Sequence, residues 1–184
     1  MKIDDLRSLR DMHFDKEEYR AALDNCDDLL KQFSDAVSFD DHFKNGLCHF
    51  KLNEDALAVS CFEKALKMEP ENLLAITNIG ICLFNQGKLE EAFLAFNRAM
   101  KINPNVFPPW YYIGLHYLKI FQDSGDLPAM EKFVNCFRVV LTQAPDFGSL
   151  PIFDPNKDVQ YGLDTFILLH SDVPDMSVDE VTAL

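Results

Sequence analysis

Residues 73–106, LLAITNIGICLFNQGKLEEAFLAFNRAMKINPNV, form a 34-residue unit that the neighbouring segments repeat. Three glycines stand one period apart, at Gly46, Gly80 and Gly114, and Pro70 and Pro104 each follow a glycine by 24 residues. A fixed period of this length is typical of proteins that are built from stacked repeats.

Apolar residues follow helical spacing on both sides of Gly87. The residues that share a helical face before this glycine are Ile76, Ile79, Gly80 and Leu83, and those that share one after it are Ala92, Phe96 and Ala99. Because glycine breaks a helix and favours a turn, this pattern predicts two helices joined at Gly87.

The spacing and residue types resemble the tetratricopeptide repeat. Its pattern is a large apolar residue, a Leu-Gly-like pair, an aromatic residue and a turn glycine, followed by Ala, an aromatic residue, Ala and Pro. The resemblance implies an all-helical fold, a right-handed superhelical solenoid of antiparallel helix pairs with a C-terminal helical cap. It also implies a protein that binds other polypeptides and carries out no known chemistry.

The period divides the chain into five expected segments. These are residues 1–37, a degenerate first repeat or N-terminal helical cap; 38–71 and 72–106, two repeats; 107–148, a repeat with an insertion; and 149–184, a C-terminal capping helix with an acidic tail. In the first segment Arg10 stands where the glycine is expected. In the fourth, seven extra residues near Gly125 predict a longer first helix and a loop.

The repeated glycine predicts a close approach of two helices. Glycine inside a helix costs about 1 kcal/mol relative to alanine, and the chain accepts this cost at three equivalent positions. We therefore expect the second helix of each repeat to bring an aromatic ring against the glycine. The rings at that position are Phe62, Phe96 and Phe137.

Charge and hydropathy exclude several kinds of partner. The formal net charge is -13, with no basic stripe, so we expect no binding to nucleic acid. No apolar run approaches the length of a membrane span, and the first residues do not form a signal peptide. These features predict a cytoplasmic protein with no membrane partner.

The sequence gives little support to catalysis or to a cofactor. It contains no phosphate-binding loop and no hydrolase or zinc-protease motif, so we expect no enzyme activity, no catalytic residue, no metal and no cofactor. The cysteines lie in helical patterns, and we expect Cys48, Cys61, Cys82 and Cys136 to be buried, with raised pKa values and little reactivity.

Polar residues occupy three positions of the second repeat that are apolar in the third. His42, Asn45 and His49 stand where Ile76, Ile79 and Leu83 stand one period later. The two histidines are seven residues apart, or about 10.5 Å along a helix, which is too far for one shared metal ion. We expect structural histidines with hydrogen-bond partners; an enzyme site at these residues is the other interpretation.

The resemblance also implies which residues line the inner wall of the solenoid. The wall positions and their neighbours that we expect to form a peptide-binding groove are Phe43, Leu47, Phe50, Leu74, Thr77, Asn78, Ile81, Phe84, Tyr111, Leu115 and Leu118. Most are apolar, and a long exposed apolar strip normally marks an interaction site. The family's carboxylate clamp for acidic chaperone tails is disfavoured, because only Asn78 matches its pattern.

The predicted function is therefore a non-enzymatic interaction module, a scaffold, adaptor or chaperone-like protein that binds an apolar peptide or an amphipathic helix. The alternative is a structural homo-oligomer, in which another copy covers the groove or the C-terminal helix mediates assembly. The C-terminal segment leaves a second choice open. A predicted helix at 157–170 has an apolar stripe, and it either caps the last repeat or occupies the groove.

Overall fold

The computed structural model describes residues 2–143, and these residues are helical with no strand. The helices are α1 (Ile3–Asp15), α2 (Tyr19–Gln32), a short 3-10 helix η1 (Ser34–Ala36), α3 (Phe39–Lys51), α4 (Asp55–Leu66), α5 (Leu73–Asn85), α6 (Leu89–Ile102), α7 (Phe107–Ser124) and α8 (Leu127–Gln143). The chain is thus an all-helical array of helix pairs, as the sequence predicts. The expected C-terminal helix at 157–170 lies outside the described residues.

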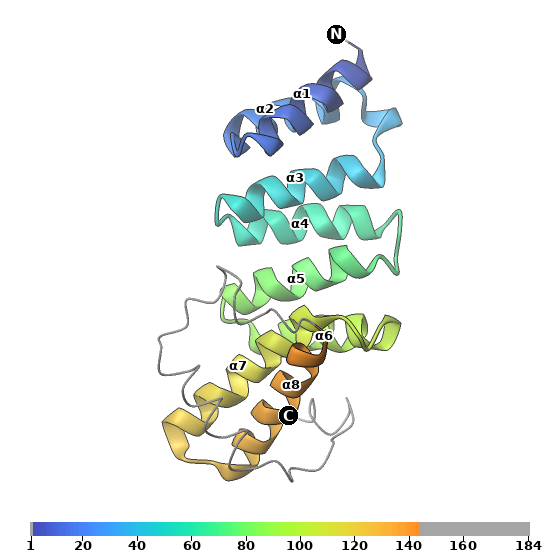
Figure 1. The fold of residues 1–184 in the computed structure, drawn as a ribbon. Coiled ribbons are helices and arrows are strands. Elements are labelled where there is room, and N and C mark those ends of the chain that lie inside the picture. Colours follow the sequence, from blue (N-terminus) through green and yellow to red (C-terminus); the bar gives the residue numbers. More distant parts are fainter. Residues whose placement is uncertain (1, 144–184) are drawn as a thin grey trace. The chain divides into compact units, whose positions relative to one another are not determined.

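The chain divides into two compact units, Met1–Ala95 and Phe96–Leu184, and the boundary falls inside α6. The sequence does not predict this division. In the first unit each helix packs on the next, from α1 through α5, and Figure 1 shows α3, α4 and α5 as successive rows. In the second unit α7 and α8 form a helical hairpin.

Two turns require a left-handed backbone, and the sequence supplies suitable residues. The φ angle is 59° at Asn53 and 75° at Gly87, the equivalent position one repeat later. Asparagine and glycine tolerate this conformation better than other residues. The prediction that Asn53 replaces the turn glycine is confirmed. Gly125, with a φ of 72°, ends the 18-residue α7, so the longer first helix is confirmed as well.

The repeated glycine makes the close helix contact that its cost predicts. A Cβ atom added to Gly46 would lie 2.6 Å from the ring of Phe62, and one added to Gly114 would lie 2.8 Å from the ring of Phe137. Both rings are fully buried. Because these distances are far below van der Waals contact, no other residue fits here without movement of the ring.

The same phenylalanine joins one repeat to the next. Phe62 forms a buried cluster with Ala58 of its own helix and with Cys82 of α5. The ring of Phe43 also contacts that of Phe62, with 5.4 Å between their centroids. Phe62 is therefore packed by α3 on one side and by α5 on the other.

At the first repeat an arginine stands in place of the glycine, and it is buried. Arg10 is only 1% exposed. Its Nη1 donates to Oδ1 of Asp41 over 2.7 Å, and its Nη2 donates to Oδ2 of Asp40 over 3.0 Å. Both acceptors lie on α3, so this side chain links the first helix of repeat one directly to the first helix of repeat two.

Asp41 is the centre of this charged junction. Its carboxylate accepts hydrogen bonds from Arg7, Arg10 and both the backbone and hydroxyl of Ser38, at distances of 2.6 to 3.0 Å. Burial alone would raise the pKa of Asp41, but these hydrogen bonds outweigh it and hold the pKa well below its usual range. The buried arginine is thereby paired with a permanently ionised partner.

Gly46→Ala should destabilise the protein through its contact with Phe62. Overpacking costs about 1–3 kcal/mol and alanine's better helix propensity returns about 1, so we expect a net loss of up to about 2 kcal/mol in denaturant unfolding. Phe62→Leu makes room for the new methyl group. The double variant should therefore be more stable than the sum of the two single changes predicts, and strict additivity would contradict this account.

Asp41→Asn should cost about 3 kcal/mol of unfolding free energy, because it leaves buried Arg10 short of its strongest partner. Asp40→Asn is the matched control; this exposed carboxylate should be worth less than about 1 kcal/mol.

The junction should also make stability depend on pH. Since the pKa of Asp41 is lower in the folded than in the unfolded chain, its contribution is complete above about pH 3.9 and is lost as the pH falls further. The wild-type chain should lose stability below pH 4 more steeply than the Asp41→Asn variant. Parallel curves would show that Asp41 is not the titrating group.

Candidate functional site

Helix α3 presents three large apolar side chains that are only partly buried. Phe43, Leu47 and Phe50 all pack on the cluster formed by Ala58, Phe62 and Cys82, and each keeps part of its surface exposed. They follow one another at intervals of four and three residues, so they lie on one side of α3. The core therefore fixes their position without covering them.

Helix α5 continues this apolar surface. Leu74 is 62% exposed, and Ile81 and Phe84 are partly exposed. Ile79 of the same helix packs on the cluster that Phe43, Leu47 and Phe50 also contact, so the exposed rows of α3 and α5 border one core. We call Phe43, Leu47, Phe50, Leu74, Ile81 and Phe84 the α3/α5 face.

The two polar residues predicted for this groove have different environments. Thr77 is buried, and its hydroxyl has no hydrogen-bond partner. Asn78 is partly exposed, and its Nδ2 donates to the backbone oxygen of Leu74 over 2.8 Å. Thr77 thus contributes to the interior of the repeat and Asn78 to its surface.

In the second unit, α7 carries the remaining predicted residues. Tyr111, Leu115 and Leu118 are partly exposed, and we call them the α7 face. The ring of Tyr111 contacts Phe137 of α8 with 5.8 Å between centroids, and burial raises the pKa of this tyrosine. The neighbouring Trp110 is buried, and its indole nitrogen donates to the backbone oxygen of Pro104 over 2.9 Å.

The unusual polar residues of α3 face neighbouring helices and do not form a catalytic group. His49 Nδ1 lies 2.7 Å from Oε2 of Glu54, and Asn45 accepts a hydrogen bond from the Cys61 thiol over 3.5 Å. His42 differs from the expectation, because its Nδ1 is buried without a partner. Burial, aided by nearby Lys64, lowers the pKa of His42 and keeps its ring neutral.

No metal site is present among residues 2–143, where no three His, Cys, Asp or Glu side chains come together as ligands. All five cysteines are buried and unbridged. Burial raises the pKa of Cys61 and Cys136, and that of Cys82 to about 12, as the sequence predicts.

One of the four cysteines contradicts that prediction. The pKa of Cys48 is lowered because its sulfur is hydrogen-bonded to Cys26 of the preceding repeat, and this outweighs the effect of burial. The same hydrogen bond, together with burial, raises the pKa of Cys26. Sequence spacing could not reveal this pair, because its members lie on different helices.

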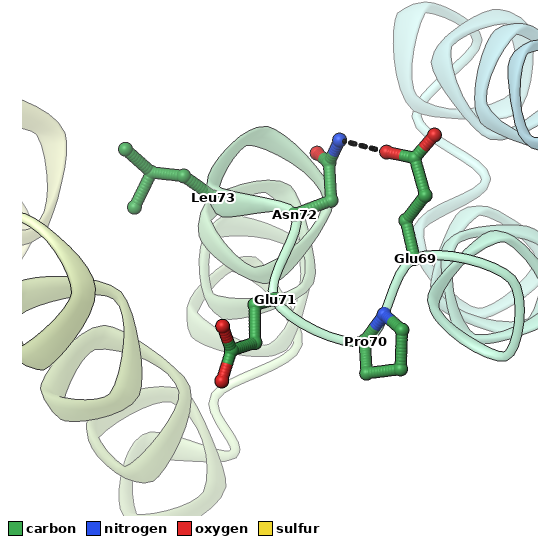
Figure 2. Close-up of a pocket in the computed structure, with 5 residues that line it drawn as sticks. All are labelled: Glu69, Pro70, Glu71, Asn72 and Leu73. Carbon is green, nitrogen blue, oxygen red and sulfur yellow. Dashed lines mark hydrogen bonds between the residues drawn. The ribbon is translucent and has the colours of Figure 1, made fainter.

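One hollow in the described surface lies at the turn between α4 and α5. Figure 2 shows its lining, which consists of Glu69, Pro70, Glu71, Asn72 and Leu73. Asn72 donates to Glu69 Oε2 over 2.8 Å and accepts from the backbone of Ala75, so it caps the start of α5. A comparable hollow at 87–91 lies at the next turn. Both hollows are features of the turns, and neither gathers catalytic groups.

None of the helices in the described part of the chain is both long and apolar enough to cross a membrane. The partly exposed apolar faces on α3, α5 and α7 are the candidates for a functional surface. Their side chains suit contact with apolar groups of another polypeptide, since they offer area for burial and little chemistry.

Comparisons with known proteins agree with this architecture. Residues 43–72 and 74–106 each match a model of the tetratricopeptide repeat. Over 74 residues the chain is 32% identical to the probable UDP-N-acetylglucosamine–peptide N-acetylglucosaminyltransferase SPINDLY of Solanum lycopersicum. That match covers 40% of this chain and only 8% of the relative, so the resemblance is confined to a small part of that enzyme.

Solved structures share the fold at low sequence identity. MamA superposes with a TM-score of 0.65 at 16% identity, over 81% of this chain and 82% of that one. YrrB, described as a tetratricopeptide repeat protein with an unusual peptide-binding site, gives a TM-score of 0.63 at 22% identity, over 77% of this chain and 69% of that one. With its period, helix pairs and two matched repeats, the chain is a tetratricopeptide repeat protein.

Proposed function

We propose that this protein is a non-enzymatic protein–protein interaction module, and that its α3/α5 face binds an apolar peptide or the apolar side of an amphipathic helix. The observation that carries the proposal is that this face holds six large apolar side chains that are partly or largely exposed, three of which, Phe43, Leu47 and Phe50, pack on the core cluster. A partner that covers them gains about 25 cal/mol for each Å² of apolar surface removed from water.

The face is also arranged for recognition of an extended partner. Its members come from the first helices of two successive repeats, and the α3 row is anchored on the cluster around Phe62, to which Ile79 and Cys82 of α5 also belong. Side chains that are already held in place lose little conformational freedom on binding, which favours affinity. The α7 face offers a similar row in the second unit.

Acidic chaperone tails are not the proposed ligand. The positions that would hold the cations and amides of a carboxylate clamp are occupied by Phe43, Leu47, Asn78, Pro108 and Tyr112. None of these is a base, so a terminal carboxylate would be desolvated there without a charged partner. The peptide-binding site of YrrB supports the class of function, while the identity of this chain's ligand rests on its own side chains.

Leu74→Glu should weaken peptide binding, because it places a charge within the α3/α5 face at its most exposed apolar side chain. The probe is a neutral fluorescent peptide with leucines at helical spacing and glutamines elsewhere, and its affinity is measured by anisotropy. We expect a loss of about tenfold, equal to about 1.4 kcal/mol.

Leu57→Glu is the matched control. Leu57 is 53% exposed but lies on α4, outside the face, and the change alters net charge equally. It should change the affinity by less than about twofold. Equal losses in the two variants, or no binding of the leucine peptide beyond that of a serine-for-leucine peptide, would refute the proposal. Sedimentation of the free chain tests the alternative, since a dimer would indicate that another copy covers the face.

A further inference from the structure

The first repeat presents charged side chains at the positions that are apolar in the α3/α5 face. Members of that face lie three or six residues before the glycine position of their repeat, or one or four after it. Counted from Arg10, these positions of α1 hold Asp4, Arg7, Asp11 and Phe14. In α3 the first of them is Asp40, and α5 contains no charged residue. Charge is thus present at one end of the surface and absent at the other.

Shared cations hold the carboxylates of α1 directly beside α3. Nε of Arg10 donates to Asp11 over 2.8 Å, and its Nη2 donates to Asp40 over 3.0 Å. Nζ of Lys44 also contacts both carboxylates, at 2.8 Å from Asp11 and 3.4 Å from Asp40. These acids therefore form one group, although they come from different repeats. We call Asp4, Asp11 and Asp40 the acidic edge of the α3/α5 face.

The carboxylates of the acidic edge face solvent more than their cations do. The side chains of Asp4, Asp40 and Asp11 are 84%, 54% and 41% exposed, whereas those of Arg10 and Lys44 are 1% and 30% exposed. Within the described part of the chain, the ion pairs and hydrogen bonds of the Asp40 side chain all involve Oδ2. Its Oδ1 is therefore available to a ligand, and the edge presents negative charge outward.

We propose that the partner carries a lysine or arginine beside its apolar residues, and that the acidic edge binds this cation and so fixes the direction in which the partner lies on the α3/α5 face. The inference rests on the proposed function and adds the charge and the polarity of the ligand to it. A ligand that crosses from α1 to α5 meets carboxylates first and then only uncharged side chains.

The spacing along α3 suits such a side chain. Asp40 lies three residues before Phe43, so the two are neighbours on one side of the helix. Phe43 is half-buried on the core cluster, and its ring offers a fixed apolar surface. The methylene stem of a lysine or arginine can pack on that ring while its charged end reaches Asp40. The same contact thus continues the apolar face into the acidic edge.

Three peptides test the proposal by anisotropy. The first is the neutral leucine peptide described above, and the other two carry two additional lysines at the N-terminal or at the C-terminal end. One lysine peptide should bind about fivefold more tightly than the neutral peptide at low ionic strength, and the other should match the neutral one. Because the new ion pairs are exposed, the gain should shrink with added salt.

Equal gains from lysines at either end would show a general attraction to the net charge of -13, and no gain from either would show that the acidic edge does not contact the ligand. Each result overturns this inference while binding of the neutral peptide leaves the proposed function intact. If none of the three peptides binds, the proposed function fails and the inference fails with it.

A pair of substitutions assigns the gain to the acidic edge. Asp4→Asn with Asp40→Asn removes two of its charges and leaves the buried Asp41 unchanged, so the difference between the two lysine peptides should disappear. The matched control is Asp24→Asn with Asp28→Asn, which removes the same charge from exposed positions of α2 and should preserve the difference. A difference that persists in the first variant, or that disappears in both, would contradict the assignment.

Discussion

The contact between Gly46 and Phe62 is the constraint on which the rest of the repeat depends. At 2.6 Å from the ring, the position of a Cβ atom is effectively occupied, so the two helices can lie this close only if the first one carries glycine. The ring held there is also packed by Phe43 and by Cys82 of the next repeat. One contact thus limits how close the two helices of the repeat lie, and the ring that makes it also joins this repeat to the next.

In the first repeat, charged side chains take the place of the contact between glycine and an aromatic ring. Arg10 stands at the glycine position of α1 and reaches Asp41 on α3, where Arg7 and Ser38 supply the remaining hydrogen bonds. A buried ion pair contributes less net stability than an apolar contact of equal size, because both charges lose their hydration. The hydrogen bonds of the junction depend on direction, so they favour a defined placement of α1 against α3. We therefore interpret the junction as a device that fixes the orientation of the terminal repeat.

Much of the fold could be predicted because features such as the repeat period, a turn asparagine and the helix glycines each have one physical cause. The period identified the helix pairs, Asn53 identified a left-handed turn, and the glycines identified the close contacts. Contacts between different helices could not be predicted from the spacing of residues along the sequence. The arginine at position 10 looked like a missing glycine, the Cys26–Cys48 pair joins two helices, and Thr77 proved buried although its spacing placed it in the groove. Each depends on how neighbouring helices are oriented, which a linear pattern does not specify.

We expect function to reside on the first helices of the repeats, where apolar side chains stay partly exposed. Hydrogen–deuterium exchange on the full chain, with and without a partner captured from its native cell extract, tests this most directly. Protection should appear in α3 and α5, while the outward turns of α4 around Ser60 keep their exchange rates. Protection confined to α2 and α4, with α3 and α5 unchanged, would show that the protein recognises its partner through the opposite surface.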